Sequence, residues 1–392
     1  MYDFSQDDII INATSSNVKE SNHILRKLYN ELNKISKFGW YCTPFREGNT
    51  IYVGDSTFGE MWICYKTKGC ISKIAFRPKD EKYREIIKKA ILTAVEDHAS
   101  MQRYAIDVVF QTHNTHFVEM SRSNVLLFGD NNNHLHVRFN LYAFGDFDLH
   151  YIATQKIHYL QMLLSVYTGN IYQLDNKCQV SHEQLEYKNM EWNYDDDWID
   201  SFCEQSGQSA AVLIPDFFDL FQLIIVEDCY SKNLRLVLNS IQDYYCALKA
   251  QQLIHSDSSY NIPGFVDSTN TLLISALEPL SCIGADSPET CPTCGNQVYK
   301  ISERIRTLCT EYLGAELAKE IGRSGYGKRC SFLHEGNAKT NEFYCGVSVP
   351  LINPSLPNEI MHVSSCLEYN YYDYISYIIR KKIHDLLKSS SL

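Results

Sequence analysis

The sequence predicts an α+β domain followed by an all-α domain, and three observations lead to this division. The chain has 392 residues, which is long enough for two domains. Up to about residue 150, short runs of β-branched and aromatic residues alternate with helical patterns, whereas strand patterns nearly vanish after about residue 205. The polar, acidic stretch 185–202 separates the two regions. We therefore expect domains at 1–200 and 205–392.

The elements of the first domain follow from local patterns. Residues 79–99 carry apolar side chains at helical spacing and predict an amphipathic helix, and 150–169 predict a second helix with Gly169 as its C-cap. Runs of β-branched and aromatic residues bounded by Gly- and Asn-rich turns predict strands at 49–55, 61–67, 104–112, 123–130 and 134–144.

The sequence predicts a helical bundle for the second domain. Residues 231–255 keep their large apolar side chains on related faces, which is typical of a helix packed among others. Three prolines between 346 and 360 predict a loop there. The expected helices cover 209–228, 231–255, 267–281, 297–322, 329–340 and 367–388.

Composition narrows the classes of function and the cell compartment. The formal net charge of −11 argues against a protein that coats nucleic acid through bulk electrostatics, although a local basic cluster stays compatible with it. No signal peptide and no apolar run of about 18 residues is found, which predicts no membrane partner. The fourteen cysteines are mostly scattered singly, as expected of thiols in a reducing cytoplasm.

The stretch RCSFLHEG, residues 329–336, contains the clearest candidate for chemistry. Arg329 can hold a phosphate as a planar fork, and His334 can move a proton near neutral pH. These are the parts needed to cleave RNA without a metal. In an ideal helix the two side chains lie about 140° apart, so they share a site only if Arg329 stands at a frayed helix start. The alternative is a capping arginine beside a half-buried histidine.

Glu278 is the acid of the otherwise apolar segment TNTLLISALEPLSC. A carboxylate is rarely buried without a partner, so Glu278 is expected to pair with a base inside the bundle or at an interface. Arg329 and His334 are candidates for that base, and Arg304 or Arg306 would give an ordinary salt bridge instead.

The order SALEPL, CPTCG, YKISERI and RCSFLHEG resembles the HEPN superfamily, in particular its Apea-like branch. The resemblance covers about residues 205–392, and the first half of the chain lies outside it. The family hallmark is an arginine, four to six intervening residues and a histidine, which Arg329 and His334 match. Cys330 departs from the polar residue that usually follows the arginine.

The resemblance implies a HEPN-like helical bundle and a metal-independent endoribonuclease that acts as a homodimer. Arg329, His334 and an acid at Glu278 would form the catalytic centre, which needs no cofactor. The family implies toxins or anti-phage effectors that cleave tRNA or mRNA, with an antitoxin or a phage-derived trigger as partner. Two alternatives stay open. One is an inactive HEPN-like module that dimerises or binds a nucleotide or a partner, and the other is a toxin modified by a nucleotidyltransferase.

The motif CPTCG suggests a structural zinc site. Cys291 and Cys294 have the spacing of a knuckle in which two thiolates hold one Zn²⁺. The sequence contains no second C-x-x-C, so free thiols are an equal alternative, and a redox pair is a third.

Three further features receive structural interpretations. His113, His116, His134 and His136 could be imagined as a metal cluster, but they occur beside Asn-rich turns that favour surface histidines. The run 195–197 of three aspartates is typical of a solvated linker. The tyrosines of YNYYDYISYIIRKK could stack on RNA bases, but their helical spacing favours a core or a dimer interface.

Overall fold

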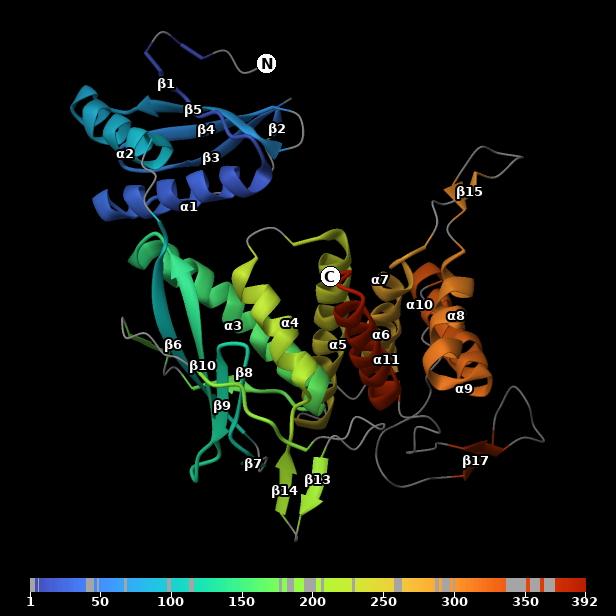
Figure 1. Ribbon diagram of the computed structural model, residues 1–392. Helices are drawn as coiled ribbons and strands as arrows, with labels where there is room; N and C mark the ends of the chain where they lie inside the picture. Colours follow the sequence, from blue (N-terminus) through green and yellow to red (C-terminus); the bar gives the residue numbers. More distant parts are fainter. Residues whose placement is uncertain are drawn as a thin grey trace.

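The fold is described from a computed structural model of the chain, shown in Figure 1. The described residues are 4–5, 7–39, 46–47, 49–66, 69–96, 100–112, 116–175, 178–181, 187–193, 202–205, 208–227, 230–256, 263–285, 289–290, 297–298, 300–335, 350–352, 360–362 and 371–392.

The N-terminal layer is an antiparallel sheet with helices packed on one face. Its strands lie in the order β1-β5-β4-β3-β2. Helices α1 and α2 contact each other, and the apolar side chains beneath them, such as Met61 and Phe76, form a separate core. The bounds are β1 Ile9–Asn12, α1 Val18–Ile35, β2 Arg46–Glu47, β3 Thr50–Asp55, β4 Gly59–Tyr65, β5 Ile71–Pro78, the 3₁₀ turn Glu81–Tyr83 and α2 Arg84–Glu96.

A second sheet follows and joins the helices. It has the order β11-β6-β10-β9-β8, with β12 also paired to β6, and the register of β6 and β10 is regular over ten residue pairs. One face of this sheet packs on α3 and α4, where the rings of Phe139 and Phe221 lie 5.1 Å apart. The bounds are β6 Gln102–Gln111, β7 His116–Phe117, β8 Met120–Arg122, β9 Val125–Gly129, β10 His134–Ala143, α3 Asp146–Thr168, β11 Gln173–Leu174 and β12 Gln179–Ser181.

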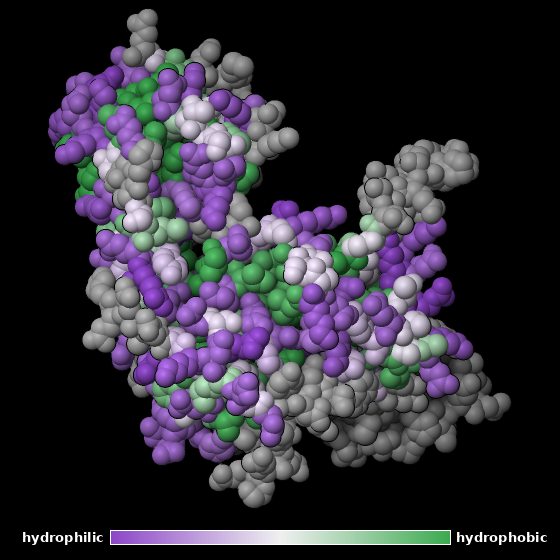
Figure 2. Space-filling model, in the orientation of Figure 1, coloured by the Kyte–Doolittle hydropathy of each residue, from purple (hydrophilic) through white to green (hydrophobic). Residues whose placement is uncertain are grey.

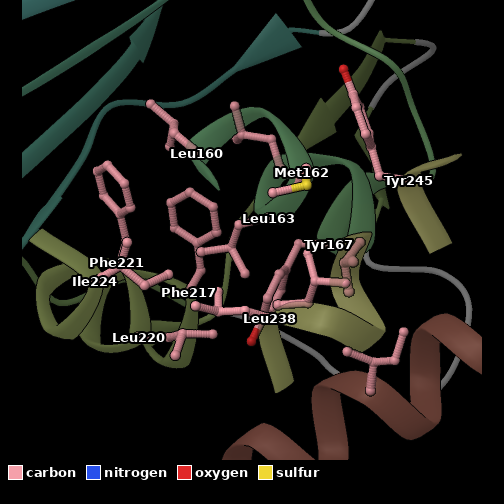
Figure 3. Close-up of a cluster of buried hydrophobic side chains, with 14 of the residues drawn as sticks. Leu160, Met162, Leu163, Tyr167, Phe217, Leu220, Phe221, Ile224, Leu238 and Tyr245 are labelled. Atoms are coloured by element: carbon pink, nitrogen blue, oxygen red, sulfur yellow. The ribbon is translucent and has the colours of Figure 1, made fainter. Parts of the chain in front are cut away.

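Helices dominate the remainder of the chain and surround a common core. Figure 3 shows Leu163 of α3, Phe217 of α4 and Leu238 of α5 within one buried cluster. The helices are α4 Pro215–Val226, α5 Lys232–Ser256, α6 Pro263–Ser275, α7 Leu277–Ser281, α8 Ile301–Leu313, α9 Ala315–Glu320, the π-helical segment Ile321–Gly325, α10 Tyr326–Glu335 and α11 Tyr371–Lys388.

Short strand pairs also occur in this second half, so it is predominantly rather than purely helical. They are β13 Phe202–Gln205 with β14 Gln208–Ala211, β15 Glu289–Thr290 with β16 Gln297–Val298, and β17 Pro350–Ile352 with β18 Ile360–His362. The α+β character of the first half and a predominantly helical second half are therefore confirmed, together with the C-cap at Gly169, whose φ of 67° lies in the left-handed region. Two expectations are corrected: the helix expected at 209–228 begins only at Pro215, after strand β14, and the loop expected at 346–360 contains strand β17.

The division between the two hydrophobic cores does not coincide with the domain boundary expected near residue 200. One core is built from residues between Ile9 and Ala94, and the other from residues between Tyr104 and Leu386. The reason is that the inner faces of β6 and β10 are covered by α3 and α4, which continue directly into the helical part.

The two cores are joined where α1 meets α3. Arg26 of α1 donates from Nε and Nη2 to the two carboxylate oxygens of Asp148, both at 3.0 Å, and from Nη2 to the carbonyl of Tyr142 at 2.8 Å. The amide of Phe144 also donates to Asp148. The carboxylate, although fully buried, is thus well paired.

The visible surface reflects this arrangement. In Figure 2 hydrophilic side chains cover much of the N-terminal layer, whereas hydrophobic ones gather beneath it, over the helices. Among the described residues, none of the helices combines the length and the apolar character that a membrane span requires.

Candidate active site

Arg329 lies inside a continuous helix rather than at a helix start. Residues 315–335 run through α9, a π-helical turn and α10 without a break, and the amide of Tyr326 donates to the carbonyl of Ile321, five residues earlier. The glycine-rich segment GRSGYG therefore widens the helix instead of fraying it. The condition under which Arg329 and His334 would share one face, a frayed start at Arg329, is not met.

The structure brings Arg329 and Glu278 together. Glu278 lies in the first turn of α7, and its Oε1 forms an ion pair with Nη2 of Arg329. Both side chains are largely buried, with exposed fractions of 15% for Arg329 and 24% for Glu278. The ring of Tyr326 lies 5.4 Å from the guanidinium carbon and covers its other side. The partner that Glu278 needs is therefore Arg329, one of the bases proposed from sequence.

The pairing of Arg329 leaves part of the guanidinium unused. Its Nε is buried and has no hydrogen bond among the described residues, and Glu278 Oε1 has no geometrically satisfactory hydrogen bond either. An ion pair of this kind holds the arginine in place through charge, but it does not saturate the donors.

His334 lies elsewhere on α10. It is exposed, in the last turn of the helix, next to the exposed side chain of Leu333. Helical geometry places it about 140° around the axis from Arg329 and about 7.5 Å along it. Within one chain, the helix therefore presents the arginine to α7 and the histidine to solvent.

The electrostatics of the site are dominated by burial and by a second acid. Burial raises the pKa of Glu278, while the nearby charge of Arg329 acts in the opposite direction. Burial also raises the pKa of Asp243 on α5, and the carboxylate of Glu278 adds to that shift. The site thus contains two carboxyl groups whose pKa values burial raises, beside one permanent cation.

Tyr326 and Cys330 complete the surroundings of Arg329. Burial raises the pKa of the Tyr326 hydroxyl, and its interaction with Cys330, one helical turn later, raises it further. Cys330 itself is a half-buried free thiol. Cys330 therefore places a tyrosine–thiol contact beside the guanidinium.

His134 and His136 share one face of β10, as their alternation predicts, but they are accompanied by carboxylates that the sequence pattern did not predict. Asp130 Oδ2 lies 3.2 Å from His134 Nδ1 and 3.5 Å from His136 Nε2. The opposite ring nitrogens face Asp175 and Asp107, at 3.7 and 3.6 Å. The available signal was Asp130 itself, four residues before His134, whereas the other two acids come from separate strands or turns.

These side chains form an alternating row of acids and imidazoles. Desolvation opposes ionisation of Asp130, but hydrogen bonds from the amides of His134 and Asn132 and from both imidazoles hold its pKa well below the usual range. In the described part of the chain, no three or more His, Cys, Asp or Glu side chains are arranged to hold a metal. The row therefore ties the β9–β10 hairpin to β6.

The remaining candidates are placed as follows. Cys291 and Cys294, His113 and the acidic run 195–197 lie outside the described residues. His116 is exposed on the short strand β7. Cys282 is half-buried and Cys309 is buried, and both are free thiols.

Comparisons with protein-family models, with curated proteins and with solved structures give no match to this chain.

Proposed function

We propose that the chain is a metal-independent endoribonuclease of HEPN type that works as a homodimer. The observation that carries the proposal is the ion pair between Glu278 and Arg329, because these two residues lie 51 positions apart and the family resemblance assigns both to one catalytic centre. The arginine is held on a helix and largely buried, and its Nε is buried without a hydrogen bond among the described residues.

In the proposed reaction the ribose 2′-oxygen attacks the adjacent phosphorus, and the bond to the 5′-oxygen breaks. The products are a 2′,3′-cyclic phosphate and a 5′-hydroxyl. Arg329 would bind the phosphate oxygens and stabilise the charge that builds up on them. His334 would act as general base or general acid, taking the proton from the 2′-hydroxyl or giving one to the leaving oxygen. Glu278 would orient the guanidinium.

A dimer is part of the proposal because one chain separates the two groups. His334 and Leu333 are both exposed on α10, so a second copy packed against this helix would bring additional groups to the histidine. RNA, either tRNA or mRNA, is the proposed substrate. A toxin or anti-phage role in the cytoplasm, with an antitoxin or phage-derived trigger, rests on the family resemblance, and structural zinc at Cys291 and Cys294 stays a prediction.

One observation favours a second candidate function. Arg329 already pairs with Glu278, and His334 faces away from both. A HEPN-like module without catalytic activity, which dimerises or binds a nucleotide or a partner protein, would not need Arg329 and His334 to lie close together. Cys330, in place of the usual polar residue, also fits this candidate.

The test is cleavage of total tRNA and of mRNA by the purified protein in EDTA. We expect Arg329→Ala and His334→Ala each to reduce the rate by about 100-fold or more, since a general acid or base contributes about 10²–10⁴-fold. Arg306→Ala on the exposed face of α8 and His150→Ala on the exposed face of α3 are matched controls and should cleave at the parental rate. If the parent leaves RNA intact in EDTA, the non-catalytic candidate replaces this one. If a double variant with both Arg329→Ala and His334→Ala cleaves as fast as the parent, these two residues do not form the catalytic centre and the proposal is wrong.

A further inference from the structure

Two successive contacts connect the helix of Arg329 to the neighbouring pair α6 and α7. Gly325 lies against Ile274 of α6, and Arg329, four residues later, pairs with Glu278 of α7, also four residues later. Since four residues make about one helical turn, both contacts lie on one face of each partner, about 6 Å apart along the axis. The stretch 325–329 and the stretch 274–278 therefore run in the same direction. The distance between them at Gly325 and Ile274 limits how closely Arg329 can approach Glu278.

Gly325 makes this approach possible because it has no side chain. A Cβ atom at Gly325 would lie 2.7 Å from Cδ1 and 3.3 Å from Cγ1 of Ile274, well inside normal carbon–carbon contact. Ile274 is 1% exposed and belongs to the large core, so it cannot move aside without repacking its neighbours. Gly322, in the same π-helical turn, faces open space, and a Cβ atom added there would have no such neighbour within 4 Å.

The π-helical turn explains why Gly325 faces α6. Compared with an uninterrupted α-helix, the additional residue in the turn rotates everything after it by about 100° and displaces it by about 1.5 Å. The turn is closed by the hydrogen bond from the Tyr326 amide to the Ile321 carbonyl. It therefore sets the direction in which the residues after it project from the helix. The turn widens the helix at the point where Gly325 meets Ile274.

We propose that Gly325 is a positioning residue for Arg329: its contact with Ile274 seats the π-helical turn on α6 and so places the guanidinium against Glu278. This inference rests on the proposed function, because its consequence is the geometry of phosphate binding. A displaced guanidinium loses binding, and a misplacement of about 1 Å can cost about 100-fold when a group must meet its target in a fixed geometry.

The experiment measures binding of a mixed-sequence 2′-O-methyl RNA oligonucleotide, which cannot be cleaved because its 2′-oxygen is blocked. We expect Gly325→Ala to weaken binding about tenfold or more, approaching the loss caused by Arg329→Ala. Gly322→Ala is the matched control and should bind as the parent does, since its methyl group meets nothing. Ile274→Val removes Cδ1, so the pair Gly325→Ala with Ile274→Val should recover most of the binding.

The outcomes separate the two proposals. If Arg329→Ala does not weaken binding, the proposed function fails. If Arg329→Ala weakens binding but Gly325→Ala binds like Gly322→Ala, the positioning role alone is wrong. If Gly325→Ala does not fold by circular dichroism, adding Ile274→Val should restore folding and binding, and a pair that stays unfolded or binds no better than Arg329→Ala overturns the steric link to Ile274.

Discussion

Two arginine–carboxylate pairs, one at the joint between the cores and one at the candidate site, are built in opposite ways. Arg26 uses both Nε and Nη2 on Asp148, and the buried carboxylate accepts a further backbone amide. Arg329 meets Glu278 through Nη2, while its Nε stays buried without a hydrogen bond in the described part of the chain. The first pair is saturated, and the second is not.

The same saturated pattern recurs at two other places in the fold. Arg122 donates from Nε and Nη2 to the two oxygens of Asp219, at 3.0 and 2.9 Å, and Arg77 does so with Asp8, at 2.9 and 3.0 Å. In these three pairs the planar fork meets both carboxylate oxygens, whereas Arg138 donates from Nε to Oδ2 of Asp107 at 2.7 Å and Oδ1 of that carboxylate has no hydrogen bond among the described residues. Arg329 departs from this two-pronged pattern, and under the proposed function a phosphate would be its second partner.

The largest effect on stability is expected at the joint. Asp148→Ala leaves Arg26 and the Phe144 amide without their acceptor, and breaking a buried pair from one side costs about 3–5 kcal/mol. The measurement is the urea-unfolding free energy. Asp146→Ala, an exposed acid in the same first helical turn, is the control and should change stability by less than about 1 kcal/mol. Equal effects of the two variants would show that the saturated pair at the joint contributes no more to stability than an exposed acid does.

A smaller effect is expected at a saturated pair that is partly exposed. Arg122→Lys keeps the charge but loses the planar fork, and with side chains 36% and 30% exposed the cost should be about 1 kcal/mol or less. The same replacement at Arg329 should change stability less still but weaken RNA binding. If Arg329→Lys destabilises the fold more than Arg122→Lys does, the pair with Glu278 is a structural fastening and the comparison breaks down.

The smallest effect concerns the pH dependence of Glu278. Because folding raises its pKa, protonated Glu278 contributes stability that is fully present below its ordinary value of 4.5 and is lost as the pH rises through the raised value. Glu278→Gln cannot ionise at this position and has no such loss. The urea midpoint of Glu278→Gln minus that of the parent should therefore increase as the pH rises from below 4.5. Glu303→Gln, at an exposed acid on α8, is the control for the replacement of an acid by an amide. If the difference between the two urea midpoints decreases with rising pH, the predicted direction of the pH effect is wrong.

The sequence predicted the elements that have a strong local periodicity. It did not predict features that depend on packing between segments far apart in the chain. The ranges of α3 and α5 and the cap at Gly169 follow from spacing and glycine chemistry. Helix α1 was not predicted, because charged and polar residues outnumber its apolar stripe. The division of the cores could not be predicted either, since only the packed structure shows that α3 and α4 cover the second sheet.

At the candidate site, the partner of Glu278 was predictable and the geometry was not. An acid in an apolar helix needs a base, and Arg329 was one of few available. A frayed helix start at Arg329 was compatible with the sequence, but the structure has a π-helical turn at 321–325 that continues into α10. The same turn sets which way Arg329 and His334 point.

Helix α11 affects when the larger core can be completed during synthesis of the chain. Helix α11 packs on α3, α4, α5 and α8, and Ser376 donates to the carbonyl of Val166, 210 residues earlier, at 2.6 Å. The larger core therefore cannot be completed until α11 leaves the ribosome, and partly synthesised chains expose the faces it will cover. Under the proposed function, the Arg329 helix is therefore seated in a finished core only after α11 has been synthesised and packed.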